Sequence, residues 1–198
     1  MLTVRHLERE WNAGSYRKLM AELLSARGEA TPRLLHDLAK PATVAAMVMV
    51  RLDELGQAHV PLFAKLLRTV LAAQESDGGW ADPVITALAL RALCITNGNG
   101  LAVDRGLAYL AALQKENGLW PAEPIRRLTG DTFVTAWILF HLGNNPSFRR
   151  LVQYDDALAA MELMEAEHAP ETKRLWTRVN RRQLSTRRPV APAATIWS

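Results

Sequence analysis

The chain has 198 residues, of which 49% are hydrophobic and 22% are charged, and its formal net charge is +4. This composition supplies apolar side chains for one sizeable core, so we expect a single domain. No apolar run is long enough to span a membrane, the first ten residues lack the apolar stretch of a signal peptide, and the single cysteine, Cys94, excludes an internal disulfide. We therefore expect a cytoplasmic protein.

Residues 1–40 are predicted to form an N-terminal helical preface that stands outside any repeat. Apolar residues recur with helical periodicity over 4–24 and 31–38, and prolines interrupt this segment. We divide the rest of the chain into helical repeats over residues 41–170 and a basic C-terminal helix and tail over 171–198.

Two copies of a spaced motif, Gln-x-x-x-Gly-x-Trp, stand forty residues apart. The motif residues are Gln74, Gly78 and Trp80 in the first copy and Gln114, Gly118 and Trp120 in the second. Self-similarity at this period is typical of stacked helical units that cannot bury their apolar faces alone. Glutamine can bond free backbone groups at a helix end, glycine lets the chain turn, and tryptophan covers the joint. We interpret the motif residues as structural.

Three segments align with one another and are apolar on nearly every side: 41–52, 82–93 and 131–142. A helix of that kind is predicted to be an inner helix. Asp82 and Asp131 open two of these segments, where a carboxylate caps free N–H groups and faces the positive end of the helix dipole.

The intervening segments 61–74 and 102–114 carry charged residues and are predicted to be outer helices. Residues 148–167 also have a helical pattern. We therefore expect helices to alternate between inner and outer positions from about residue 42 to residue 167, with no β-strand ladder in that span.

The second motif copy extends upstream to Arg105, giving Arg105-Gly106-x-x-Tyr109-Leu110 before Gln114. The complete pattern resembles the QW repeat of the squalene and oxidosqualene cyclases and of the wider prenyltransferase-like α/α-toroid group, over residues 41–145. The resemblance implies an all-α fold, specifically a partial α/α toroid of alternating inner and outer helices. A closed toroid has more hairpins than this chain can supply, so a protein partner or a homo-oligomer is expected to cover the open stack.

The resemblance also identifies where catalytic acids should stand. In class II terpene cyclases the protonating acid lies in an Asp-x-Asp-Asp-Thr-Ala segment that opens an inner helix. The matching stretch here begins at Asp131, but Phe133 and Val134 replace the second and third aspartates. Asp131 and His141 remain the candidate catalytic residues. Their simpler interpretations are a helix cap and a core histidine, and we expect no cyclisation started by protonation.

An apolar wall is predicted on the inner helices from aligned positions and helical spacing. Its candidate substrate-binding residues are Met47, Leu88, Phe133, Trp137 and Phe140. Such a wall suits an isoprenoid or another apolar ligand, and aromatic faces can stabilise a carbocation. The alternative is that these side chains fill a core too small to stay hollow.

The protein prenyltransferases, a second comparison, hold zinc through Asp, Cys and His. Asp53, Cys94 and His141 stand near the aligned ends of the three inner segments, but no Asp-x-Cys spacing occurs. We therefore expect no metal and no cofactor.

The C-terminal end is strongly basic. From Thr172 onward there are seven basic residues and no acidic one. Trp176 and Val179, interleaved with arginines, resemble a surface amphipathic helix that suits peripheral contact with anionic lipid, whereas no motif supports nucleic-acid binding. The simpler alternative is that the basic face of this helix is only exposed to water.

Three functions remain open from the sequence, one of which is a subunit whose active site is completed by another chain. The other two are as follows. The first is a terpene-cyclase-like or prenyltransferase-like protein that binds, and in an active form transforms, an apolar substrate. The second is a non-catalytic α/α-toroid scaffold or subunit that binds a protein partner.

Overall fold

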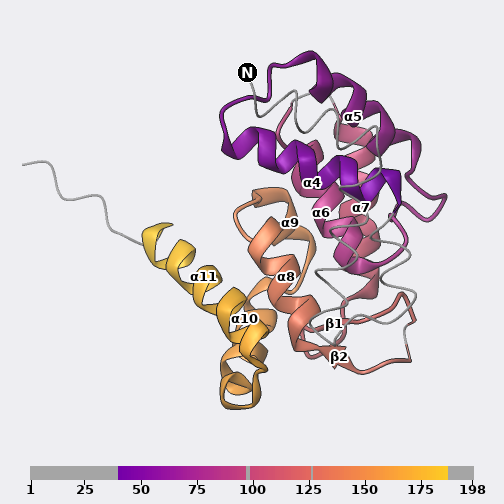
Figure 1. Cartoon of the computed structure of the whole chain (residues 1–198). Coiled ribbons are helices and arrows are strands. Elements are labelled where there is room, and N and C mark those ends of the chain that lie inside the picture. Colours follow the sequence, from indigo (N-terminus) through magenta and orange to yellow (C-terminus); the bar gives the residue numbers. More distant parts are fainter. Residues whose placement is uncertain (1–39, 97–98, 126, 187–198) are drawn as a thin grey trace, which may run out of the picture.

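Figure 1 shows the computed structural model of the chain, in which residues 40–96, 99–125 and 127–186 are described. The helices predicted within residues 1–39 and the tail after residue 186 lie outside these ranges. Helices dominate the described residues, so the all-α prediction is confirmed at that level. No helix in these ranges is both long enough and apolar enough to cross a membrane.

The helices follow one another along the chain with short connections. They are α4 (Pro41–Glu54), α5 (Pro61–Ala72), α6 (Pro83–Leu93), α7 (Gly100–Leu113), α8 (Thr132–Leu142), α9 (Pro146–Leu151), α10 (Tyr154–Leu163), the 3-10 turn η1 (Glu165–Glu167) and α11 (Pro170–Thr186). Two short strands, β1 (Trp120–Pro121) and β2 (Gly130–Asp131), form one antiparallel pair.

The helices pack in two sets. In the first set, α4 packs on α6, α6 on α8, and α8 on α11. In the second set, α5 packs on α4, α7 on α6, and α10 on α8, so each helix covers a member of the first set. Figure 1 shows α11, in yellow, lying beside α8 at the edge of the molecule.

The burial of each set follows from its sequence pattern. In α6 every residue except Arg91 is buried, as expected of a helix that is apolar on all sides. In α5 only Leu62, Phe63, Leu66 and Val70 are buried, which leaves a charged outer face. The segments predicted as inner helices therefore form the centre of the described core.

The expectation that no β-strand ladder occurs between residues 42 and 167 is wrong at one place. Trp120 pairs with Asp131 and Pro121 with Gly130. The first motif copy has only Ala81 between Trp80 and Asp82, in a tight turn with a φ of 66°. The second copy has a longer loop between Trp120 and Asp131, and the strand pair closes that loop.

The predicted helical segment 148–167 is broken into α9, α10 and η1. The break falls at Val152, which is extended, and at Gln153. The backbone N–H of Gln153 donates to the side-chain oxygen of Gln114 at 2.8 Å, and its carbonyl accepts from the Gln114 amide at 3.1 Å. These bonds hold the chain in a turn, which a single-helix pattern could not indicate.

Candidate functional site

The two motif tryptophans make equivalent contacts at successive joints between helices. The indole Nε1 of Trp80 donates to the carbonyl of Val70 at 2.8 Å, and that of Trp120 donates to the carbonyl of Leu110 at 2.8 Å. Both rings are buried, at 2% and 0% exposure. Each therefore ties the loop before α6 or α8 to the helix that precedes that loop, and neither ring has a free face for a ligand.

The motif glutamines connect each loop to the start of a following helix, α7 or α10. The side-chain amide of Gln74 donates to the carbonyls of Gly78 and Ala102, both at 2.8 Å. The amide of Gln114 makes the corresponding bond to Gly118 at 2.8 Å and reaches Gln153. Each glutamine amide therefore bridges the glycine of its own turn and a carbonyl at the start of a following segment.

The motif glycines permit close contact between loop and helix. Gly78 and Gly118 have φ values of 95° and 80°, which L-residues with a side chain rarely adopt. A Cβ atom on Gly78 would lie 2.6 Å from the carbonyl oxygen of Arg105. The guanidinium of Arg105 also donates to the carbonyls of Glu75 and Ser76. Conformation and space therefore both require glycine.

Asp131, the candidate acid, is engaged as a helix cap. Its Oδ1 accepts from the backbone N–H of Val134 at 2.9 Å, as Asp82 accepts from Ile85 at 2.8 Å. The hydroxyl of Thr135 donates to the Asp131 carbonyl and accepts from the N–H of Trp120. This geometry fits the capping role that the sequence predicts for both aspartates.

The aromatic face of α8 is the place where predicted site residues come together. The ring of Trp137 lies between Phe133, at a centroid distance of 6.2 Å, and His141, at 4.5 Å. Phe140 meets His141 edge-on at 5.0 Å. Phe133, Trp137 and Phe140 are all partly exposed. The aromatic face therefore retains surface for a contact.

His141 is poorly suited to donate a proton. Its Nε2 is fully covered and has no hydrogen-bond partner among the described residues. Burial, together with the positive charges of Arg91 and Arg182, lowers the pKa of His141 to about 3. The imidazole is therefore neutral near pH 7, and its environment opposes a second proton.

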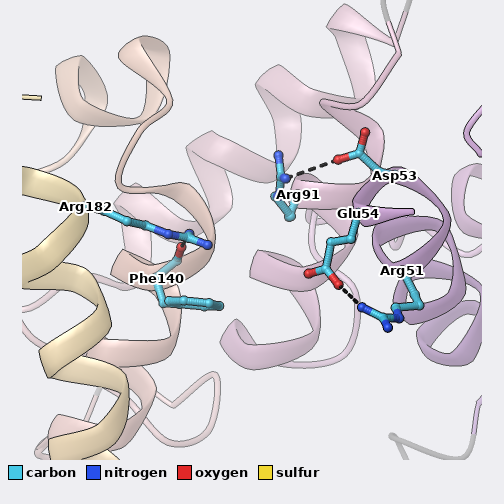
Figure 2. Close-up of polar contacts among 6 residues, drawn as sticks. All are labelled: Arg51, Asp53, Glu54, Arg91, Phe140 and Arg182. Atoms are coloured by element: carbon cyan, nitrogen blue, oxygen red, sulfur yellow. Dashed lines mark hydrogen bonds and ion pairs between the residues drawn. The ribbon is translucent and has the colours of Figure 1, made fainter. Parts of the chain in front are cut away.

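Positive charge surrounds the exposed end of the aromatic face. The guanidinium carbon of Arg182 lies 4.2 Å from the Phe140 ring centroid, and Arg182 donates to the Phe140 carbonyl at 2.8 Å. Arg178 lies 6.0 Å from the same centroid. Figure 2 shows Arg182 beside Phe140, and Arg91 of α6 paired with Asp53. Burial lowers the pKa of Arg182, and the charges of Arg91 and Arg178 lower it further.

The remaining predicted wall residues contribute less. Leu88 is 4% exposed and belongs to the core, whereas Met47 on α4 is partly exposed. The Trp137 indole donates to the Val84 carbonyl at 3.1 Å. The polar edge of the Trp137 ring is thus bonded to α6 one turn before Leu88, the residue whose position in α6 corresponds to that of Trp137 in α8.

The residues weighed for zinc make other contacts. Asp53 pairs with Arg91 at 3.3 Å, and the Cys94 sulfur accepts from the Asn145 amide at 3.4 Å. Burial raises the pKa of the Cys94 thiol. Within the described ranges, no three His, Cys, Asp or Glu side chains are grouped to hold a metal ion.

One hollow that the described residues line lies elsewhere. It encloses about 590 Å³ between the start of α4 and one side of α5, where Lys40, Lys65 and Arg68 contribute. No residue of the predicted wall lines it. The hollow is open to solvent and so differs from an enclosed ligand cavity.

Sequence reasoning missed the arginines at the aromatic face. Arg91 is the one residue of α6 that is not buried, and a lone charge in an apolar helix was an available signal. The contact of Arg182 with Phe140 joins residues 42 positions apart, which no local pattern could reveal.

Comparison with models of protein families, with curated proteins and with solved structures finds no match for this chain.

Proposed function

We propose that this chain is an arc of an α/α toroid that binds an apolar ligand, such as an isoprenoid, against the aromatic face of α8 without transforming it. The arc consists of the hairpins α4–α5, α6–α7 and α8–α10, closed at one end by α11. Support for the arc comes from the equivalent joints at Trp80 and Trp120 and from the sequential packing of α4, α6, α8 and α11.

The observation that carries the binding proposal is the partly exposed row of Phe133, Trp137 and Phe140. Aromatic side chains contribute large apolar contact areas, and ligand sites are lined mainly by such residues with a few polar groups. Arg182, close to the Phe140 ring, supplies a polar group at one end. An apolar ligand that carries an anionic end would match both features.

The two candidate catalytic residues, Asp131 and His141, both have structural surroundings that favour a non-catalytic protein. Asp131 holds the first turn of α8, and His141 is a neutral base among positive charges. An enzyme that starts cyclisation needs an acid aimed at the substrate, whereas the Asp131 carboxylate accepts from the backbone of α8 and the pKa of His141 is low.

The test is the affinity of the full-length protein for a panel of linear isoprenoid alcohols, measured by calorimetry. Trp137→Ala and Phe140→Ala should each weaken binding about tenfold, since one buried aromatic contact contributes roughly 1.5–3 kcal/mol. Leu101→Ala is the matched control, because Leu101 is 78% exposed and lies on α7. Equal affinities in all four proteins would refute the proposal.

The second candidate is a scaffold that binds a protein partner. It is favoured by large apolar side chains that remain exposed away from the aromatic face, among them Leu101 at 78% and Leu163 at 88%. Failure of the wild-type protein to bind any isoprenoid, combined with capture of a defined partner that Leu163→Ser abolishes, would select this candidate.

A further inference from the structure

Opposite charges are segregated onto the two helices at the C-terminal end of the array. The segment from α10 through η1 contains five acidic residues and no lysine or arginine: Asp155, Asp156, Glu162, Glu165 and Glu167. The next helix, α11, contains five basic residues and a single acid, Glu171. Both helices pack against α8.

The charges lie on the outer faces of these helices. On α11, Trp176 and Val179 are buried, and Arg174, Arg178 and Arg181 are exposed on the opposite side. On α10, Ala157, Leu158 and Met161 are buried, and Asp155 and Glu162 are exposed. We call Arg174, Arg178 and Arg181 the basic strip, and Asp155 and Glu162 the acidic strip.

Within the described part of the chain, none of Asp155, Glu162, Arg174 and Arg181 belongs to an ion pair. A strip of like charges on a helix repels itself and is stabilised by a surface of opposite sign. The molecule therefore carries two complementary charged strips that do not neutralise each other within these ranges.

The two strips also match in spacing. Asp155 and Glu162 are seven residues apart, as are Arg174 and Arg181. Seven residues correspond to two helical turns and about 10.5 Å along the axis. When α10 of one copy lies along α11 of another, both acids reach an arginine at once.

Leu163 adds an apolar contribution at the same place. It follows Glu162 at the end of α10 and is 88% exposed, the highest value among the large apolar residues described. A partner that covers the acidic strip would remove part of this side chain from water. Burial of apolar area stabilises an interface, whereas exposed ion pairs contribute little alone.

We propose that the acidic and basic strips bind a second copy of this chain, with α10 of each copy against α11 of the other. This arrangement has two-fold symmetry, so the acid-to-arginine contact is made twice. It does not depend on the proposed ligand, because the aromatic side chains of α8 take no part in it. Arg178 lies 6.0 Å from the Phe140 ring centroid, and the test therefore leaves Arg178 unchanged.

The test uses sedimentation velocity on the full-length protein. The wild type should dimerise at low salt and dissociate at about 1 M salt, where the screening length falls to about 3 Å. The double variants Asp155→Lys/Glu162→Lys and Arg174→Glu/Arg181→Glu should each weaken self-association about tenfold or more. Circular dichroism establishes that each variant is folded, and single reversals at Glu162 and Arg174 replace any double variant that is not.

An equimolar mixture of the two double variants provides the decisive measurement. One variant then carries two basic strips and the other two acidic strips, so a heterodimer regains both contacts and should form at least as readily as the wild-type dimer. The control pair Arg68→Glu/Asp104→Lys changes exposed charges on α5 and α7 and should leave association unchanged.

Three results would overturn the proposal. They are a wild-type protein that stays monomeric at low salt, a dimer that survives in both reversed variants, and a mixture that does not associate. If a monomeric wild type instead binds anionic lipid vesicles or an oligonucleotide through the basic strip, the occupant of that strip is a polyanion and the proposal is likewise refuted.

Discussion

At the scale of single residues, His141 shows how packing sets chemistry. Its ring is held between Trp137 and Phe140, its Nε2 has no partner among the described residues, and its pKa falls from an ordinary 6.5 to about 3. Removing water disfavours the imidazolium, and the guanidinium groups of Arg91 and Arg182 act in the same direction. The low pKa therefore reports a structural environment rather than an acid poised for catalysis.

This environment predicts a pH-dependent stability. The unfolded chain binds a proton at His141 below pH 6.5, whereas the folded chain does so only near pH 3. The stability that neutral His141 contributes is therefore fully present above pH 6.5 and is lost as the pH falls toward 3. At pH 5 the loss is about 2 kcal/mol. The measurement is the free energy of unfolding at pH 7 and pH 5 for the wild type and for His141→Leu.

The difference between the two proteins isolates His141, because every other group is the same in both. His168→Leu is the comparison variant: burial lowers the pKa of that histidine too, and this variant should keep the part of the pH dependence that His141→Leu removes. If His141→Leu has the same pH dependence as the wild type, His141 is not buried as neutral imidazole in solution.

The motif tryptophans give a second prediction at this scale. Trp80→Ala and Trp120→Ala should each lower the free energy of unfolding by about 3–5 kcal/mol, because each removes a large buried ring. Trp80→Phe and Trp120→Phe retain most of the apolar volume and lose the Nε1 bond, so they should cost less. Urea denaturation measures all four, and unchanged midpoints in the alanine variants would show that these side chains do not join the repeats.

At the scale of elements, the helix starts were the most predictable part of the structure. Asp82 and Asp131 each precede an apolar helix and accept from the N–H three residues later. Asp82→Ala and Asp131→Ala should therefore each destabilise the protein by about 0.5–2 kcal/mol, while the asparagine variants keep an acceptor and should cost less. Thermal unfolding of the four variants tests this. An alanine variant as stable as wild type would remove that aspartate from the capping role.

The helices could be predicted where local pattern and burial agree, and they could not where distant contacts decide. Residues 83–93 are apolar on every side but one and form α6 as expected. Residues 148–167 carry an equally helical pattern, yet the side chain of Gln114 holds the backbone of Gln153 in a turn. That contact spans 39 residues, and only the folded chain creates it.

The candidate site was predicted in part for the same reason. Phe133, Trp137 and His141 are four residues apart along one helix, so their proximity follows from helical geometry. The arginines beside them come from α6 and α11. Helix spacing cannot predict which distant helices meet.

At the scale of the whole molecule, the repeated joint supports an array but leaves its ends without a further repeat. The first joint recurs at the second with the same donors and acceptors. Beyond α10 no third motif follows, and α11 packs on α8 with its basic residues outward. An array that ends on α11 presents basic side chains at that end, whereas a closed ring has no such end surface.

Catalytic activity would require several helices to place an acid and a substrate together. Because Phe133 and Val134 stand where the resemblance places two acids, and Asp131 caps α8, the wild-type protein should not turn over squalene or geranylgeranyl diphosphate by protonation. Product formation on linear isoprenoids, measured for wild type, Asp131→Asn and Trp137→Ala, checks this expectation. Asp131→Asn should remain folded with little loss of stability, whereas Trp137→Ala should weaken ligand binding and also lower stability, because it loses the bond to Val84 and the ring contacts. A cyclised product from wild type that disappears in folded Asp131→Asn would make Asp131 the proton donor, and the cap would then be the means by which α8 holds its acid.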